Sequence, residues 1–201
     1  MDRSNGYEGI AAKFQAVRTA IGAREVGEWA RTLPRGAEVL DLGCGSGIPI
    51  ARELVNQGLK VWAIDASPSM LEAFRANFPS APVACEAVDE SNFFDRVFDG
   101  VVAWGLMFLL PADEQRRLIR RAAGILAPEG RLLFTSPAAT EPVVWNDSMT
   151  GRESRCLSGT EYREILSTGG LTVIREYEDE GGNHYFDTIK QTVPSASTLN
   201  E

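Results

Sequence analysis

The sequence predicts an α/β protein whose core is a doubly wound, mostly parallel sheet. Strand-like apolar runs alternate five times with segments of helical spacing between Val39 and Pro137, which is typical of a parallel sheet. The first run, Val39–Leu42, leads directly into glycines at every second position, Gly43, Gly45 and Gly47, and then into a helical segment. A chain of 201 residues with 44% hydrophobic residues is long enough to bury one such core.

Composition and charge narrow the possible partners and the setting. A net charge of −8 argues against a nucleic acid as the main partner. The first residues lack the apolar region of a signal peptide, and no apolar run reaches the roughly 18 residues that a membrane span requires. With three scattered cysteines and one histidine, neither a disulfide framework nor a zinc site is expected. We therefore expect a cytoplasmic protein, monomeric or homodimeric, without a bound metal or a membrane contact.

One broken helix or two short helices are predicted ahead of the first strand, over residues 8–33. Apolar residues recur at helical spacing on both sides of Gly22, which interrupts them, and Pro34 ends the second run. The simplest interpretation is that these helices cover one edge of the sheet.

The glycine turn after Val39–Leu42 favours a ligand that approaches the backbone closely. Glycine has no Cβ, and the free N–H groups at a helix N-terminus point outward. Dinucleotide-binding turns read G-x-G-x-x-G, and the position of their third glycine is here Ile48. The observed spacing is G-x-G-x-G, with Asp41 two residues ahead of the first glycine. This pattern resembles motif I of the class I S-adenosylmethionine-dependent methyltransferases.

The resemblance covers about Tyr7 to Lys190 and is specific from Val39 to Pro137. It implies a Rossmann-like sheet of seven strands, in which the last strand is antiparallel and inserts beside the fifth. It also implies an enzyme that uses S-adenosylmethionine as its cofactor.

Acidic residues end the next two predicted strands. Lys60–Asp65 is the second strand, and Asp65 comes 18 positions after the last glycine, near the offset of about 20 at which a carboxylate binds ribose hydroxyls. A carboxylate suits a diol because it accepts two hydrogen bonds and has no donor of its own. The third strand is Val83–Glu86, and in the family an acid at its end binds the adenine amine. Glu86 matches that position, with Asp89 as a second acid close by.

The resemblance assigns cofactor contacts along the chain. In many small-molecule methyltransferases an N-terminal helix closes over the cofactor, often with a tyrosine, and Tyr7 is the candidate here. Met70 lies one turn into the helix that Ser67 and Pro68 begin, so it either follows the adenine ring or belongs to the core. The implied cofactor-binding residues are Tyr7, Asp41, Gly43, Cys44, Gly45, Asp65, Ala66, Met70, Glu86, Ala87, Val88 and Trp104.

The fourth predicted strand, Phe98–Trp104, leads into an apolar segment. Many amino-group and DNA methyltransferases carry an Asn/Asp-Pro-Pro-aromatic motif here, whereas this chain has Trp104-Gly105-Leu106-Met107. The difference disfavours a DNA base or a glutamine as the acceptor. A helix is predicted over Asp113–Leu126, and we interpret the arginines on its outer face as solvated. They are Arg116, Arg117, Arg120 and Arg121.

The C-terminal part predicts a fifth strand, a loop, a helix and a hairpin. The run APEGRLLFTSP is predicted to be a turn and then the fifth strand. Residues 138–157 lack sustained periodicity and are predicted to be a functional or disordered loop. Ser158 and Glu161 form a capping box for the helix. Leu171–Glu178 and Asn183–Lys190 alternate as a hairpin. The single domain is expected to span residues 1–190, followed by a disordered tail over 191–201.

Acceptor contacts are expected at the carboxyl ends of the fourth and fifth strands and in the segments that lie over them. The candidates are Leu106, Met107, Trp145, His184 and Tyr185. Trp145 either holds the acceptor, stabilises the sulfonium charge through its ring, or fills an open edge of the core. His184 is the one side chain that ordinarily titrates near neutral pH, but a structural role is the simpler interpretation.

These observations predict a methyltransferase that acts on a small molecule. Two alternatives remain open: a nicotinamide-dependent oxidoreductase, disfavoured by Ile48, and a non-catalytic protein that uses the fold as a cofactor-binding scaffold. The residues identify neither a catalytic base nor the acceptor.

Overall fold

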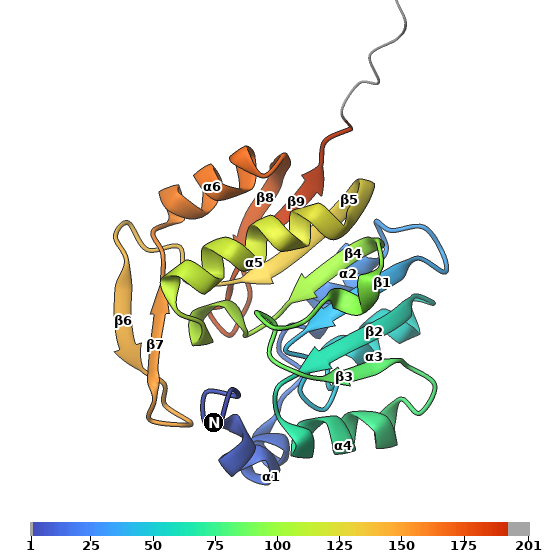
Figure 1. Cartoon of the computed structure of the whole chain (residues 1–201), viewed down its shortest axis with the longest axis vertical. Helices are drawn as coiled ribbons and strands as arrows, with labels where there is room; N and C mark the ends of the chain where they lie inside the picture. The colour runs from blue at the N-terminus through green and yellow to red at the C-terminus, as the bar shows by residue number, and fades with distance from the viewer. Residues whose placement is uncertain (1, 193–201) are drawn as a thin grey trace, which may run out of the picture.

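A seven-stranded sheet in the order β3-β2-β1-β4-β5-β9-β8 lies at the centre of the structure, a computed structural model that describes residues 2–192 (Figure 1). Its strands are β1 Glu38–Leu42, β2 Lys60–Asp65, β3 Val83–Cys85, β4 Phe98–Ala103, β5 Leu126–Thr135, β8 Leu171–Glu178 and β9 His184–Lys190. The first five strands run parallel, and β9 runs antiparallel to both β5 and β8. The predicted sheet, with an antiparallel last strand beside the fifth, is confirmed.

Helices cover both faces of the sheet (Figure 1). They are α1 Tyr7–Val17, α2 Ala23–Ala30, α3 Ile50–Asn56, α4 Pro68–Asn77, α5 Ala112–Ile125 and α6 Gly159–Thr168, with short 3₁₀ turns η1 Phe93–Asp95 and η2 Met107–Leu109. Strand residues alternate between two apolar cores, because successive side chains point to opposite faces. Leu40 and Leu42 pack with α5 and α6, whereas Val39 packs with α2, α3 and α4.

Two helices begin at the serines that the sequence places there. Ser67 Oγ accepts a hydrogen bond from the Met70 amide at 3.2 Å, and Pro68 occupies the first turn of α4. Ser158 Oγ accepts one from the Glu161 amide at 3.1 Å at the start of α6. Such bonds satisfy amides that have no partner within the helix, so these helix ends are set locally.

The segment predicted as a loop, residues 138–157, contains a hairpin. Strand β6, Val143–Asn146, pairs antiparallel with β7, Glu153–Cys156, as a separate two-stranded sheet. Asp147 fixes the turn, since its Oδ1 accepts hydrogen bonds from the amides of Met149 and Thr150 at 2.9 and 2.7 Å. The sequence did not reveal these strands because each is only four residues long and β6 lacks an apolar–polar alternation.

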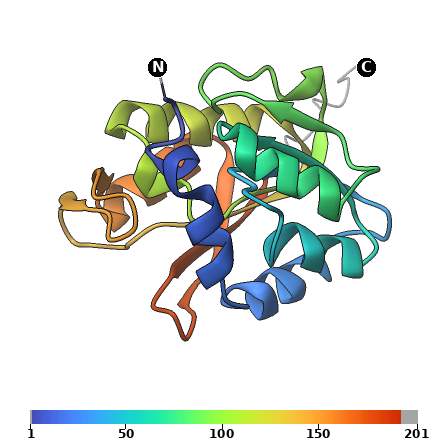
Figure 2. The same ribbon diagram turned by 90° about the horizontal axis from the view of Figure 1, so that it is seen from below.

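The N-terminal segment crosses the carboxyl edge of the sheet. Figure 2 shows α1, in dark blue, between α4 on one side and the β6–β7 hairpin on the other. It therefore covers the end of the sheet at which ligands of doubly wound folds bind.

The start of the predicted tail contacts the domain. Gln191, which the sequence places in the tail, donates its backbone N–H to the Gly170 carbonyl at 3.0 Å. Most of the predicted tail, residues 193–201, lies outside the described residues. None of the helices within residues 2–192 combines the length and the apolar character that crossing a bilayer requires.

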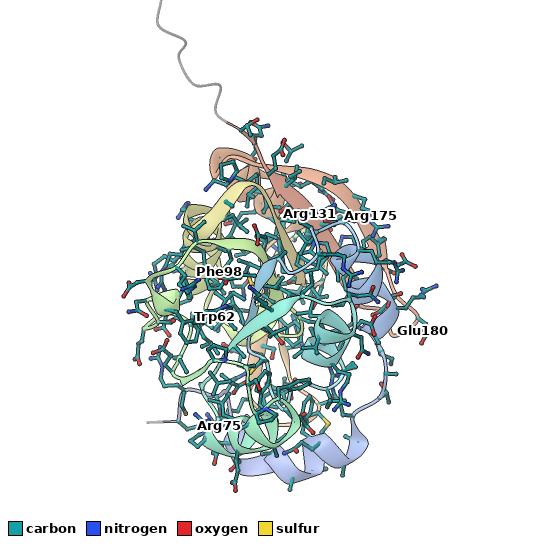
Figure 3. The ribbon with its side chains drawn as sticks, turned by 90° about the vertical axis from the view of Figure 1, so that its right-hand side faces the viewer. Trp62, Arg75, Phe98, Arg131, Arg175 and Glu180 are labelled. Atoms are coloured by element: carbon teal, nitrogen blue, oxygen red, sulfur yellow. The ribbon has the colours of Figure 1, made fainter. Side chains whose placement is uncertain are left out.

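A buried carboxylate joins the antiparallel end of the sheet. Asp187 on β9 is fully buried and accepts hydrogen bonds from Arg131 on β5 at 2.7 Å and from Arg175 on β8 at 3.2 Å. The two arginines lie close together on this side of the molecule (Figure 3). Three neighbouring strands are thereby connected through one side chain.

Candidate active site

The glycine turn after β1 leaves open space on one side and is tightly packed on the other. Gly45 and Gly47 have φ angles of 55° and 79°, which side chains other than glycine rarely adopt. A Cβ on Gly47 would lie 2.4 Å from the Phe78 ring, whereas the nearest atom to one on Gly45 would be the Met70 sulfur at 4.0 Å. A ligand can therefore approach the backbone at Gly45.

Asp65, at the end of β2, is held against this turn. One carboxylate oxygen accepts from the Gly45 amide and the other from the Ser67 amide, both at 2.8 Å. Burial raises the pKa of this carboxyl group, and the two amide bonds oppose that change. Each oxygen keeps a further lone pair that can accept a hydrogen bond from a ligand.

Asp41, on β1, is buried with one oxygen unpaired. Its Oδ2 has no hydrogen-bond partner among residues 2–192, although the side chain is only 1% exposed. Burial, reinforced by the nearby Asp65 charge, raises the pKa of Asp41 to about 8. A buried carboxylate of this kind is stabilised by a cation or a donor supplied by a ligand.

A cavity of about 450 Å³ lies between the strand ends and the N-terminal segment. Its lining includes the glycine turn, Asp41, Asp65 and the residues after β3, and α1 contributes Tyr7 and Phe14. This volume lies within the range of pockets that hold drug-sized ligands.

Arg18 and Trp104 form part of the cavity lining that the sequence only partly indicated. The Arg18 guanidinium lies 4.2 Å from the Trp104 ring centre, and Arg18 Nε donates to the Ile48 carbonyl at 3.3 Å. Burial lowers the pKa of Arg18, and the Asp41 charge is among the influences that oppose this. No side chain within the described residues accepts a hydrogen bond from this guanidinium.

A chain of hydrogen bonds fixes the Trp104 side chain. Its indole Nε1 donates to the Tyr185 hydroxyl at 2.7 Å, and that hydroxyl donates to Asp179 at 2.8 Å. Asp179 lies in the turn between β8 and β9, and Tyr185 lies on β9. These two residues therefore fix the Trp104 ring in its position next to Arg18.

The N-terminal residues 2–8, which we call the strap, are bound at three places around the cavity. Glu8 accepts hydrogen bonds from the hydroxyls of Ser67 and Ser69 at 2.5 and 2.7 Å, at the start of α4. Asp2 pairs with Arg152 on the hairpin side at 3.0 Å, and Arg3 pairs with Asp89 after β3. The strap therefore closes the cavity on the side opposite the sheet.

Comparison with known proteins agrees with this geometry. Residues 39–130 match the sequence profile of a family described as Methyltransferase domain. These findings support a class I S-adenosylmethionine-dependent methyltransferase.

Two curated methyltransferases are similar in sequence. An uncharacterized methyltransferase of Mycobacterium tuberculosis is 34% identical over 163 residues, 76% of this chain and 59% of that protein. The 27-O-demethylrifamycin SV methyltransferase of Amycolatopsis mediterranei is 34% identical over 153 residues, 69% of this chain and 55% of that protein. This chain thus spans a little over half the length of these relatives.

A solved structure confirms the methyltransferase fold. The 1,6-didemethyltoxoflavin-N1-methyltransferase of Burkholderia thailandensis superposes with a TM-score of 0.75 at 20% identity, over 94% of this chain and 87% of that one. These comparisons do not favour the oxidoreductase or scaffold alternatives.

The methyltransferase cavity brings together every residue for which the resemblance implied cofactor binding. Glu86, Ala87 and Val88 follow β3, and Met70 lies beside Gly45. The implied residues come from the ends of four adjacent strands, β3, β2, β1 and β4, and from the helices α1 and α4.

Of the acceptor candidates, only Leu106 lines the cavity. Met107 is 1% exposed within the core, and Trp145 packs on Phe108 with ring centres 6.0 Å apart. His184 Nε2 lies 3.0 Å from Glu176 on β8, which fits the structural role. Together with Tyr185, whose hydroxyl holds Trp104, these residues lie behind the cavity surface, and we do not retain them as acceptor contacts.

Not all of the α5 arginines are solvated. The Arg121 guanidinium donates to the carbonyls of Val88 at 2.8 Å and Asp89 at 3.2 Å, and also to that of Ser91. It also lies 4.2 Å from the Phe93 ring centre. The spacing on α5 correctly placed Arg121 away from the core but could not show that the loop after β3 folds back onto it.

Proposed function

We propose that this protein transfers a methyl group from S-adenosylmethionine to a small molecule bound in the cavity under α1. The observation that carries this proposal is the alignment of Asp41, Asp65 and Glu86 at the ends of β1, β2 and β3, in one cavity with the glycine turn. The order of these acids matches the order of the amino-acid, ribose and adenine parts of the cofactor.

The unpaired groups of the cavity fit the charged end of that cofactor. Asp41 Oδ2 is an acceptor without a partner, and Arg18 is a cation without a carboxylate partner among residues 2–192. The amino-acid part of S-adenosylmethionine carries one ammonium and one carboxylate. Asp41 would accept from the ammonium, and Arg18 would donate to the carboxylate.

The remaining parts fit groups already described. Asp65 has a free lone pair on each oxygen for the ribose hydroxyls, and Gly45 allows close approach. Glu86 would accept from the adenine amine, and Ala87 or Val88 would donate a backbone N–H to the ring.

The bound cofactor supplies an already activated methyl group, so the task of the protein is positioning. Arg18 and Asp41 would fix the amino-acid end, and the strap would exclude water while the acceptor is aligned. Such alignment supplies as much as ~7–11 kcal/mol in favourable cases.

A small acceptor is supported by the closed cavity and by the relatives. The strap is bound on both sides of the cavity, which leaves little room for a macromolecular segment. Two similar proteins are named for small acceptors, 27-O-demethylrifamycin SV and 1,6-didemethyltoxoflavin. The acidic net charge of −8 points in the same direction.

Two measurements test the proposal. Titration calorimetry should show binding of S-adenosylmethionine and S-adenosylhomocysteine and none of NAD. Methyl groups labelled with ¹⁴C should then pass from the cofactor to a metabolite extract. Binding of NAD alone would favour an oxidoreductase, cofactor binding without transfer a scaffold, and label only in protein or RNA a macromolecular acceptor.

A further inference from the structure

One end of the cavity holds, apart from Tyr7, residues that were not assigned above to the cofactor. Its lining comes from the strap, α1 and the segment after β4, and includes Asn5, Tyr7, Phe14, Leu106 and Phe108. We call these residues the acceptor end. Leu106 and Phe108 follow β4, which lies on the opposite side of β1 from β2 and β3, so this part of the lining is separate from Glu86.

Aromatic side chains make up much of the acceptor end. The rings of Tyr7 and Phe14 meet edge to face with centres 5.1 Å apart, and Phe108 is supported from behind by Trp145. The Tyr7 hydroxyl lies 3.4 Å from Asp147, which keeps this ring in place. Fixed aromatic surfaces favour planar, apolar ligands.

The charged side chains close to this end already have partners. Asp2 pairs with Arg152 at 3.0 Å, and Arg3 pairs with Asp89. Glu114 lies 4.0 Å from Arg117. Arg18 is the exception among the lining cations: its guanidinium lies 4.2 Å from the Trp104 ring centre and 5.4 Å from that of Phe14, and in the proposed function it is paired with the carboxylate of the cofactor. A charged acceptor would therefore lose its hydration without gaining a counter-charge.

Asn5 supplies the one polar group of the acceptor end that lacks a partner. Its amide nitrogen Nδ2 is buried and has no hydrogen-bond partner among residues 2–192. Asp2 shapes the chain around it, accepting from the Ser4 amide at 2.9 Å and the Gly6 amide at 3.1 Å. Asn5 has a φ of 50°, a conformation that asparagine tolerates better than most residues. A buried donor held in this way calls for an acceptor atom on a ligand.

We propose that the methyl acceptor is an uncharged, planar conjugated molecule whose carbonyl oxygen accepts a hydrogen bond from Asn5 Nδ2. Its ring system packs against Tyr7, Phe14 and Phe108. Asn5 is then a residue that determines acceptor specificity. This inference rests on the proposed function, since it takes the opposite end of the cavity to hold the cofactor.

Binding of three probes tests the proposal, by calorimetry with and without S-adenosylhomocysteine. Coumarin is neutral and carries a conjugated carbonyl, 2-naphthol is neutral without one, and 2-naphthoate is an anion. With S-adenosylhomocysteine bound, coumarin should bind at least ~10-fold more tightly than 2-naphthoate, because the carboxylate of the cofactor product then occupies Arg18 and leaves the anion without a free cation. Tighter binding of 2-naphthoate that is lost in Arg18→Met would assign the site to an acidic acceptor and overturn the proposal.

The variant Asn5→Asp keeps the shape and the backbone tolerance but replaces the donor with an acceptor. It should weaken coumarin binding about 10-fold and leave 2-naphthol binding nearly unchanged. Asn56→Asp, the same change at an exposed position on α3, is the control. If Asn5→Asp does not fold, Asn5→Gly removes the donor at the same φ. Unchanged coumarin binding in these variants, or no coumarin binding at millimolar concentration, would refute the assignment.

The two proposals fail in different ways. Binding of S-adenosylhomocysteine is measured separately and should be the same in wild type and in Asn5→Asp. Loss of cofactor binding in the wild type contradicts the proposed function. If Asn5→Asp binds S-adenosylhomocysteine normally and binds coumarin as tightly as the wild type does, only the role of Asn5 is contradicted.

Discussion

At the scale of single residues, two neighbouring buried carboxylates differ in their partners. Asp65 accepts hydrogen bonds from two backbone amides, whereas Asp41 Oδ2 accepts none within the described residues. Asp65 is therefore ready to accept further bonds from a neutral diol, and Asp41 from a cation. The two acids consequently give different predictions.

Replacing Asp65 with alanine should weaken cofactor binding by about 1–3 kcal/mol, because the ribose hydroxyls would lose a charged acceptor. Titration calorimetry with S-adenosylhomocysteine measures this loss. Asp99→Ala is a suitable control, since Asp99 also accepts a backbone hydrogen bond, from the Glu38 amide at 2.8 Å, but lies outside the cavity. Equal weakening in both variants would point to a general structural effect.

Asp41 should make stability depend on pH. Because its folded pKa is about 8 and its ordinary value is 3.8, the folded state holds a proton that the unfolded state has lost between those values. The free energy of unfolding therefore falls as pH rises from about 4 to 8. Asp41→Asn cannot lose a proton, so this contribution disappears. Each 1 kcal/mol lost from the free energy of unfolding lowers Tm by roughly 2–4 °C.

Thermal melting of the free protein between pH 5 and pH 8 tests this expectation. The Tm of the wild type should fall more over this interval than that of Asp41→Asn. Asp99→Asn, which makes the same chemical change elsewhere, should melt like the wild type. Parallel curves for all three proteins would contradict the raised pKa of Asp41.

At the scale of elements, the site depends on segments that fix one another across the sequence. Arg121 on α5 binds the carbonyls of the loop after β3, and the strap binds α4 through Glu8. The first contact joins a helix to an irregular loop, and the second joins the start of α1 to the start of α4.

Replacing Arg121 with methionine should weaken cofactor binding about 10-fold, because the loop that carries Ala87 and Val88 loses three hydrogen bonds. Methionine keeps the apolar part of the side chain. Arg120→Met, one position earlier and exposed, should leave affinity unchanged. If the loop only supports the fold, Tm will fall in Arg121→Met while the affinity of the remaining folded protein holds.

The strap, α1 and the β6–β7 hairpin should become more protected when the cofactor binds. Their contacts with the rest of the domain are mainly polar and partly exposed, as in Asp2–Arg152 and Glu8–Ser69, and such contacts open easily. Hydrogen exchange with and without S-adenosylhomocysteine measures the change. Glu8→Gln should raise exchange in α1 of the free protein. Equal exchange in both ligand states would show that these segments are closed throughout.

At the scale of the whole molecule, the sheet was predictable and the closure of the cavity was not. The strand, glycine turn and helix at Val39–Asn56 follow from local sequence, because apolar runs and glycines act on their immediate neighbours. No sequence pattern indicated that Arg18 or Asn5 would line the cavity. Each reaches the cavity only because α1 folds back over the sheet. The pairing of β9 with β5 likewise places Tyr185 where its hydroxyl accepts a hydrogen bond from Trp104.

The buried Asp187 should matter for the stability of the whole sheet. Asp187→Asn removes the charge between Arg131 and Arg175 and leaves Arg131, which is only 12% exposed, without its carboxylate. A loss of about 3 kcal/mol is expected from a broken buried pair, discounted for the half-exposed Arg175. Chemical denaturation measures it. Cofactor affinity should not change, because the pair lies outside the cavity.

The hairpin β6–β7 and the strap are additions to a sheet that can hold the cofactor with its own strand ends. Arg152 and Asp147 of the hairpin segment meet Asp2 and Tyr7 of the N-terminal segment, and they do so at the acceptor end. Substitutions in these two segments can therefore reshape the acceptor end while the glycine turn stays as it is. During divergence from a common ancestor, proteins of this kind would acquire new acceptors by exchanging these outer segments together.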